Sequence, residues 1–184
     1  MRILIALLLV FAGSIAKADA SADQLALSNQ ILSPLIQLLR SGDLSKAFLP
    51  PYNKHREAKG KRPLSLEEIE PIFKQTSEAT EKAYIDAFAT EFSLEELQFI
   101  SRLFSTKFGI GLMETFSQSV ASGSPKKPDA SRFTDKDIAE FQSVSQENPE
   151  LFHSLSARLE RVSAAARTNL SVFAKAHPEL KFPD

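Results

Sequence analysis

Cysteine is absent from the 184-residue chain. Its absence excludes disulfide bonds, thiolate zinc sites, a nucleophilic cysteine and a lipid-anchoring cysteine behind a signal peptide. We therefore expect a protein that is not lipidated and that folds on its apolar core alone. A domain of this size can do so, because it buries roughly 68–70 % of the surface that its unfolded chain exposes.

An excess of charge of either sign is also missing. The formal net charge is −1 at pH 7, and loss of residues 1–20 removes two basic residues and one acidic residue, which leaves −2. Proteins that bind nucleic acids usually carry a basic excess, because neutralisation of phosphates supplies much of their affinity. The charge therefore argues against a nucleic-acid partner.

Only the N-terminal segment contains a long apolar run. Residues 3–11 are uniformly apolar, they follow Arg2, and the small-residue patterns Ala16-Lys17-Ala18 and Ala18-Asp19-Ala20 come after them. This order is typical of a signal peptide, and the run is about half of the ~20 residues that a membrane-spanning helix needs. We predict a cleavable signal peptide at residues 1–20, with cleavage after Ala18 or Ala20, and a periplasmic mature form without a membrane span.

Apolar residues recur at spacings of three and four in the segments 25–39, 66–88, 97–120, 138–144 and 152–173. This spacing is typical of helices that bury one face. Pro34 is expected to restart or kink the first of these segments. No alternating run is long enough for a sheet strand, and no Asn-Gly or Asp-Gly hairpin turn occurs. The predicted fold is all-α, a compact bundle of about five to seven helices built from capped helix-turn-helix units, in one domain at residues 21–184.

Three predicted helices share the same pattern at their first residues. A Ser or Thr precedes an acid by three positions, at Ser65 and Glu68, Ser93 and Glu96, and Thr134 and Asp137. The hydroxyl accepts a free backbone N–H of the first turn, the acid accepts the N–H of the cap, and flanking apolar residues pack across the start. These apolar pairs, called hydrophobic staples, are Leu64 with Ile69, Phe92 with Leu97, and Phe133 with Ile138.

Capping also accounts for the acid pairs Glu67-Glu68 and Glu95-Glu96. Adjacent side chains on a helix point about 100° apart, so neither pair is expected to act as an acid and base on one substrate.

Residues 93–122 and 134–176 both follow the order of capped helix, turn and second helix, which suggests an internal duplication.

Two segments are predicted to interrupt the helices. A short apolar turn at residues 44–49 leads into Pro50-Pro51-Tyr52 and the basic stretch 54–62, which we predict to be a loop. A solvated linker is the preferred interpretation, and an anionic-ligand patch or a protease-sensitive dibasic site are the alternatives. Gly123-Ser124-Pro125 is predicted to end another helix, Asn148-Pro149 to begin the last one and His177-Pro178 to end it.

The stretch Phe92-Ser93-Leu94-Glu95-Glu96-Leu97, followed by Leu103-Phe104 and Gly109, resembles a family of exported bacterial proteins catalogued as domain of unknown function twenty fifty-nine. The resemblance covers residues 84–116 best and implies a small helical domain behind a signal peptide. Leu103-Phe104 stand for the family's aromatic pair, and Thr106, Lys107 and Gly109 stand for its Ser-Pro-x-Gly turn. Leu103 and Lys107 depart from that pattern, and the resemblance transfers no catalytic residue.

Residue patterns that would indicate catalysis are missing. His55, His153 and His177 are far apart in the sequence, and none has the spacing of a metal-binding pair such as His-Glu-x-x-His. Gly109-Ile110-Gly111 lacks the preceding strand and the third glycine of a dinucleotide site, and no nucleophile elbow or phosphate loop occurs. We predict no catalytic residue, no metal, no cofactor and no enzyme activity.

The fourteen phenylalanines recur at core spacing and are most simply core residues, but they also suit an apolar cavity or a groove for a partner helix. The first hypothesis is a non-enzymatic binding or protein-interaction module, with an unknown partner or a second copy of itself. The alternatives are a carrier of a small apolar, lipid-like molecule and a hydrolase with an unrecognised site. A partner groove predicts a contiguous exposed apolar patch, a carrier predicts an internal cavity, and a hydrolase predicts converging polar groups.

Overall fold

A computed structural model describes residues 20–122 and 126–180. These residues form eight α-helices and two short 3₁₀ turns, without a strand among them, and the predicted all-α class is confirmed. The helices are α1 (Ala22–Ile31), α2 (Ser33–Arg40), α3 (Asp43–Glu57), α4 (Leu66–Glu91), α5 (Leu94–Ser105), α6 (Lys107–Ser122), α7 (Asp135–Ser145) and α8 (Pro149–Ala176), with 3₁₀ turns η1 (Ala130–Arg132) and η2 (Pro178–Leu180). The predicted cleavage region and the helix stop at Gly123-Ser124-Pro125 involve residues 1–19 and 123–125, outside the described residues.

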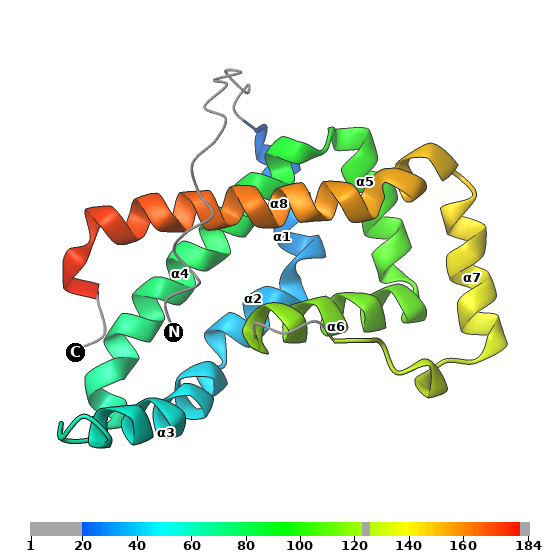
Figure 1. Cartoon of the computed structure of the whole chain (residues 1–184). Coiled ribbons are helices and arrows are strands. Elements are labelled where there is room, and N and C mark those ends of the chain that lie inside the picture. Colours follow the sequence, from blue (N-terminus) through cyan, green and yellow to red (C-terminus); the bar gives the residue numbers. More distant parts are fainter. Residues whose placement is uncertain (1–19, 123–125, 181–184) are drawn as a thin grey trace.

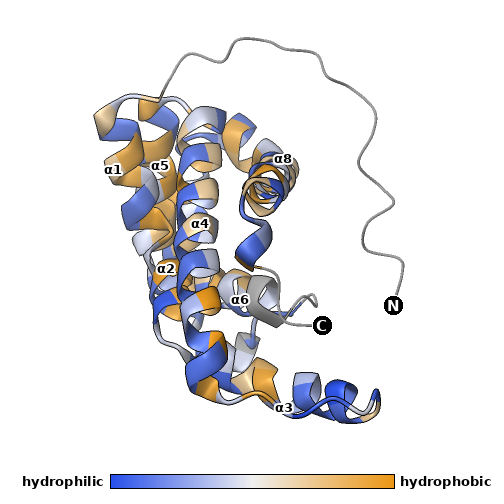
Figure 2. Ribbon diagram, turned by 90° about the vertical axis from the view of Figure 1, so that its left-hand side faces the viewer, coloured by the Kyte–Doolittle hydropathy of each residue, from blue (hydrophilic) through white to orange (hydrophobic). Residues whose placement is uncertain are grey.

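The two longest helices, α4 and α8, cross each other and form the most extensive helix pair (Figure 1). Figure 2 shows α1 and α5 on one side of α4 and α8 on the other. Helix α2 packs on α4 and α6, whereas α7 packs on α5 and α6. Pro34 lies in the first turn of α2, so the expected restart after α1 is confirmed.

Among the described residues, four helices begin with a complete capping box, and the caps are Ser21, Ser65, Ser93 and Thr134. At Ser93, the hydroxyl accepts the Glu96 N–H at 3.3 Å, and the Ser93 N–H donates to the Glu96 carboxylate at 2.8 Å. Asp137 makes the same exchange with Thr134 at 3.3 and 2.8 Å, although its side chain is shorter. The three predicted boxes are confirmed, and the box at Ser21, with Gln24 as its partner, was not predicted.

The apolar core lies where α1, α2, α4, α5 and α8 meet. Its largest fully buried apolar side chains are Phe88, Phe92, Leu32, Leu35, Leu97, Ile100, Leu103 and Val162, and Ile69 is fully buried outside this cluster, near the start of α4. Full burial of one such side chain contributes roughly 1.5–3 kcal/mol, which makes these contacts the main stabilising force. Leu64 and Ile69 of the first predicted staple are buried, whereas Phe133 and Ile138 of the third are half-buried.

The predicted turn at residues 44–49 and the first part of the predicted loop at residues 50–62 are wrong, because α3 runs from Asp43 through Pro50-Pro51 to Glu57. Contacts from α3 to distant residues hold it in place. The Phe48 ring packs edge-on against Phe73 of α4 at 5.3 Å, and the Asn53 amide exchanges two 2.8 Å hydrogen bonds with the backbone of Leu64. The basic residues 54–56 form the last turn of α3, where they complement the negative end of the helix dipole.

The predicted interruption at residues 106–109 is confirmed, because α5 ends at Ser105 and α6 begins at Lys107. The Thr106 hydroxyl accepts the Gly109 N–H at 3.1 Å and donates to the Leu103 carbonyl at 2.8 Å. A Cβ atom on Gly109 would lie 2.1 Å from the Leu103 carbonyl oxygen. Only glycine therefore allows α6 to leave the end of α5 at this angle.

A partly buried ion cluster fastens α8 to the corner between α4 and α5. Arg158, whose side chain is 16 % exposed, contacts the Glu96 carboxylate at 2.5 Å, the Glu91 carboxylate at 3.2 Å and the Glu91 carbonyl at 2.5 Å. Its guanidinium also lies over the Phe92 ring, 4.3 Å from the centroid, and Arg161 adds a second contact with Glu91 at 2.7 Å. The cluster thus fixes where α8 crosses the core.

Candidate ligand-binding site

An apolar pocket of about 460 Å³ lies among five helices, α4 to α8. Its lining consists of Phe88, Phe104, Phe108, Leu112, Met113, Phe116, Phe141, Phe152, Leu155, Ser156 and Leu159. Six of these side chains are phenylalanine, and Ser156 is the one polar residue in the set. The volume lies within the range of known small-molecule sites, which are also mostly apolar with a few polar groups.

The pocket exists because α6 and α8 are held by different neighbours. Helix α6 packs on α2, α5 and α7, whereas α8 packs chiefly on α4. Figure 1 shows α8 above and α6 below, running in similar directions, with α5 and α7 beside the N-terminal ends of both helices. Phe104, Phe108, Phe116 and Phe152 remain half-buried in this region.

Aromatic rings form the wall of the pocket beside α7. The rings of Phe108 and Phe141 meet edge-on at 5.1 Å, and those of Phe141 and Phe152 meet edge-on at 5.8 Å. Phe133 packs on the outer side of Phe108 at 4.9 Å, and a Cβ atom on Gly111 would overlap the Phe133 ring at 2.2 Å. Edge-to-face pairs contribute roughly 0.5–1.5 kcal/mol beyond burial, so this wall is well defined.

The other end of the pocket is more polar. Phe116 packs edge-on against the buried Tyr84 ring at 6.5 Å. Burial raises the pKa of Tyr84, while a hydrogen bond with Ser163 and the charge of Arg167 act in the opposite direction. The Arg167 Nε donates to the Ser163 carbonyl at 3.2 Å. The Arg167 guanidinium and the Tyr84 ring therefore lie beyond the apolar lining, on the side of Ser163 and Phe116 respectively.

The three histidines are His55 on α3, His153 on α8 and His177 directly after α8, and none of them lines this pocket. His55 is exposed on α3, and the His153 Nδ1 lies 2.5 Å from the Pro149 carbonyl. His177 follows α8, with its ring 4.4 Å from Phe173 and its Nδ1 2.9 Å from the Glu179 carboxylate. Within residues 20–122 and 126–180, no group of three or more His, Asp or Glu side chains is arranged to hold a metal ion.

The second member of each acid pair, Glu68 or Glu96, interacts with the backbone and with an arginine. Glu68 binds Arg62 and the Ser65 N–H, and these contacts lower its pKa to about 2. Arg158, and the Ser93 N–H to a smaller extent, lower the pKa of Glu96.

In the described part of the chain, no helix has both the length and the apolar character that crossing a membrane requires.

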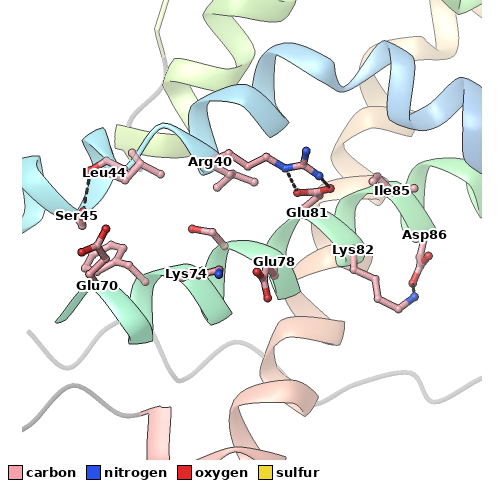
Figure 3. Close-up of a pocket in the computed structure, with 14 residues that line it drawn as sticks. Arg40, Leu44, Ser45, Glu70, Lys74, Glu78, Glu81, Lys82, Ile85 and Asp86 are labelled. Atoms are coloured by element: carbon pink, nitrogen blue, oxygen red, sulfur yellow. Dashed lines mark hydrogen bonds and ion pairs between the residues drawn. The ribbon is translucent and has the colours of Figure 1, made fainter. Parts of the chain in front are cut away.

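A second hollow, of about 590 Å³, lies between α2, the start of α3 and α4 (Figure 3). Its apolar surface comes from Leu39, Leu44, Phe73 and Ile85. Charges of both signs surround it, and Arg40 reaches across from α2 to Glu81 of α4 with contacts of 2.9 and 2.5 Å. Lys82 pairs with Asp86 at 2.6 Å on the same helix, so most of this rim is internally neutralised.

Sequence reasoning missed part of the pocket and found part of it. The core spacing marked Phe104, Met113, Phe116 and most other lining residues as apolar faces, and the phenylalanine content suggested a cavity as one alternative. Ser156, Tyr84, Ser163 and Arg167 were not singled out, since nothing in their local sequence distinguishes them. The distance between α6 and α8 depends on long-range packing.

Comparison of the chain with family models, with curated proteins and with solved structures found no match.

Proposed function

We propose that this protein binds a small apolar molecule in the pocket between α6 and α8 and does not catalyse a reaction. The observation that carries this proposal is the lining itself, with six phenylalanines from five helices and a single polar side chain, Ser156. A hydrolase would need converging polar groups around a reacting atom. One serine hydroxyl without a neighbouring base in the lining does not supply them.

Outside the pocket lining, the exposed large apolar side chains of the described residues are isolated, which favours a small ligand in the pocket over a partner helix elsewhere on the surface. Among the described residues, the large apolar side chains that remain exposed are Ile110 at 45 % and Val172 at 63 %, on α6 and α8 respectively. A docked helix would need a contiguous apolar patch, because isolated exposed apolar residues are normal on soluble proteins. The apolar surface that lacks a partner instead lines the pocket.

The binding energy available in such a pocket is adequate. Each CH₂ group transferred from water to an apolar site contributes about 0.8 kcal/mol. Association costs several kcal/mol in lost translation and rotation, so a chain or ring system of moderate size reaches micromolar affinity. The ligand that suits the lining is therefore uncharged over the part that enters the pocket.

We further propose that the protein is exported by its predicted signal peptide and acts in the periplasm as a carrier. Membership of the exported family catalogued as domain of unknown function twenty fifty-nine is likewise our proposal and rests on residues 84–116. N-terminal sequencing of the mature form should begin at Asp19 or Ser21. A mature chain that retains Met1 would contradict the export proposal.

The binding proposal is tested with the neutral dye N-phenyl-1-naphthylamine, whose fluorescence rises in apolar surroundings. We expect a saturable rise at one site per chain and displacement by decan-1-ol. The variant Ser156→Phe places a large ring at the exposed edge of the lining and should weaken dye binding at least tenfold.

The matched control is Ala157→Phe, the adjacent exposed position on α8, which lies outside the lining. It adds the same ring about 100° around the helix and should leave binding unchanged. Both variants replace exposed residues, so the urea concentration at which each unfolds should differ little from that of the native chain. Equal binding by both variants, or absence of saturable binding by the native chain, would refute the proposal.

A further inference from the structure

We propose that the ligand is a single-chain amphiphile with a carboxylate at one end, whose hydrocarbon chain occupies the phenylalanine pocket and whose carboxylate lies at Arg167, Ser163 and Tyr84. This inference rests on the proposed function and specifies the ligand class of the same site. It joins two observations, the elongated apolar lining and the polar groups that continue it along α8.

The lining is elongated along the helices. On α6 it extends from Phe108 to Phe116, which is about 12 Å at the rise of an α-helix. On α8 it extends from Phe152 to Leu159, about 10 Å. An elongated pocket between two helices of similar direction accommodates a hydrocarbon chain better than a compact ring system.

The two ends of the pocket differ in chemistry. Phe108, Phe141 and Phe152 close the end beside α7 with edge-on ring contacts. At the opposite end, Phe116 packs on Tyr84, and Ser163 follows Leu159 by about one helical turn. The asymmetry gives an amphiphile one orientation, with its apolar end against the phenylalanine wall.

A cation is available at the polar end. Arg167 follows Ser163 by one turn on the same side of α8, and its guanidinium uses Nε for the Ser163 carbonyl. Within the described part of the chain, Arg167 has no carboxylate within ion-pair distance, in contrast to Arg158 and Arg161 of the same helix. Its remaining N–H groups are suited to a carboxylate, to which guanidinium binds through paired hydrogen bonds.

An acidic residue also lies on this side of α8. Glu160 is exposed and lies one turn before Ser163, on the solvent side. It would favour an ammonium group instead of a carboxylate if the polar end of the ligand lay closer to it. The choice of a carboxylate rests on the Arg167 guanidinium, which contacts the Ser163 carbonyl one turn beyond the lining, and on Tyr84, whose ring contacts Phe116.

The test compares three probes with the same chain and different ends, namely decanoate, decan-1-ol and decylamine. Dissociation constants are measured at pH 7.5 by displacement of N-phenyl-1-naphthylamine from the full chain. We expect decanoate to bind about fivefold more tightly than decan-1-ol, a modest gain because Arg167 is exposed, and decylamine to bind most weakly.

Two variants locate the carboxylate. Arg167→Gln should abolish the preference for decanoate and leave the affinity for decan-1-ol unchanged. Lys175→Gln removes the same charge from the same helix, two turns further along, and should preserve the preference.

Equal affinities for the three probes would overturn the inference and leave the proposed function intact. A preference for decylamine that is lost in Glu160→Gln would also overturn it, in favour of a cationic ligand. Failure of all three probes to bind would overturn both the inference and the proposed function.

Discussion

Arg158→Met is expected to destabilise the protein strongly, because this side chain joins α8 to two other elements. The substitution removes the contacts of Arg158 with the Glu96 carboxylate, the Glu91 carboxylate and the Glu91 carbonyl, and the contact with the Phe92 ring. The methionine retains most of the apolar stem. The decrease in the free energy of unfolding therefore reports on the contacts of the guanidinium.

The magnitude follows from burial and from the contacts that remain. Removal of one partner from a fully buried ion pair costs about 3–5 kcal/mol. Here Glu91 is 13 % exposed but keeps Arg161 at 2.7 Å, and Glu96 keeps the Ser93 N–H at 2.8 Å. We therefore expect a loss of about 2–3 kcal/mol in the free energy of unfolding, measured by urea denaturation at pH 7 with far-ultraviolet circular dichroism.

Arg102→Met is the matched control, because Arg102 pairs with Glu147 at 2.7 Å while its side chain is 60 % exposed. An exposed pair of this kind contributes roughly 0–1 kcal/mol. Arg158 lowers the pKa of Glu96, so the contribution of their contact is present at neutral pH and is lost as the pH falls through that lowered pKa. The effect of Arg158→Met should therefore shrink in acid. Equal losses for both variants at pH 7 would refute this account of the cluster.

Three further predictions concern local features. Ser93→Ala and Thr134→Ala should each cost about 1 kcal/mol in urea denaturation, because each removes a cap hydroxyl, and unchanged stability in both would contradict the assignment of the caps. Gly109→Ala should lower the thermal midpoint more than Gly42→Ala. A Cβ atom at position 109 would lie 2.1 Å from a backbone oxygen, whereas position 42 has open space and only a positive φ of 71°. A larger loss for Gly42→Ala would contradict this packing. Lys107 and Thr134 hold the pKa of Asp137 at about 2, so its contribution to stability should be lost as the pH falls from about 4 to about 2. The stability difference between native protein and Asp137→Asn should accordingly disappear over that range, and a difference that grows in acid would contradict the sign.

Features set by neighbouring residues were predictable from the sequence. The capping boxes at Ser65, Ser93 and Thr134 need only residues within one turn, and all three form. The restart at Pro34 and the interruption near Gly109 also depend on local backbone chemistry. These features place most helix starts correctly.

Features set by long-range packing were not predictable from the sequence. Pro50-Pro51 and the basic residues after them favour a loop by local rules, yet contacts of Phe48 and Asn53 with distant residues hold this segment as a helix. Arg158 has no local pattern that marks it, since both of its carboxylate partners come from residues more than sixty positions away. The pocket has the same origin, because its walls come from five helices.

The central claim, that the pocket between α6 and α8 holds an apolar ligand, is tested most directly at Met113. The chain has two methionines, at positions 1 and 113, and Met113 is buried in the lining of the pocket. A ¹³C-methyl methionine spectrum therefore contains one resonance from the pocket, which Met113→Leu identifies by its disappearance. On titration with decan-1-ol, the account predicts that this resonance shifts and reaches saturation at one equivalent of bound ligand, and that Ser156→Phe needs at least tenfold more decan-1-ol for the same shift. A Met113 resonance that stays in place at saturating decan-1-ol would contradict the account.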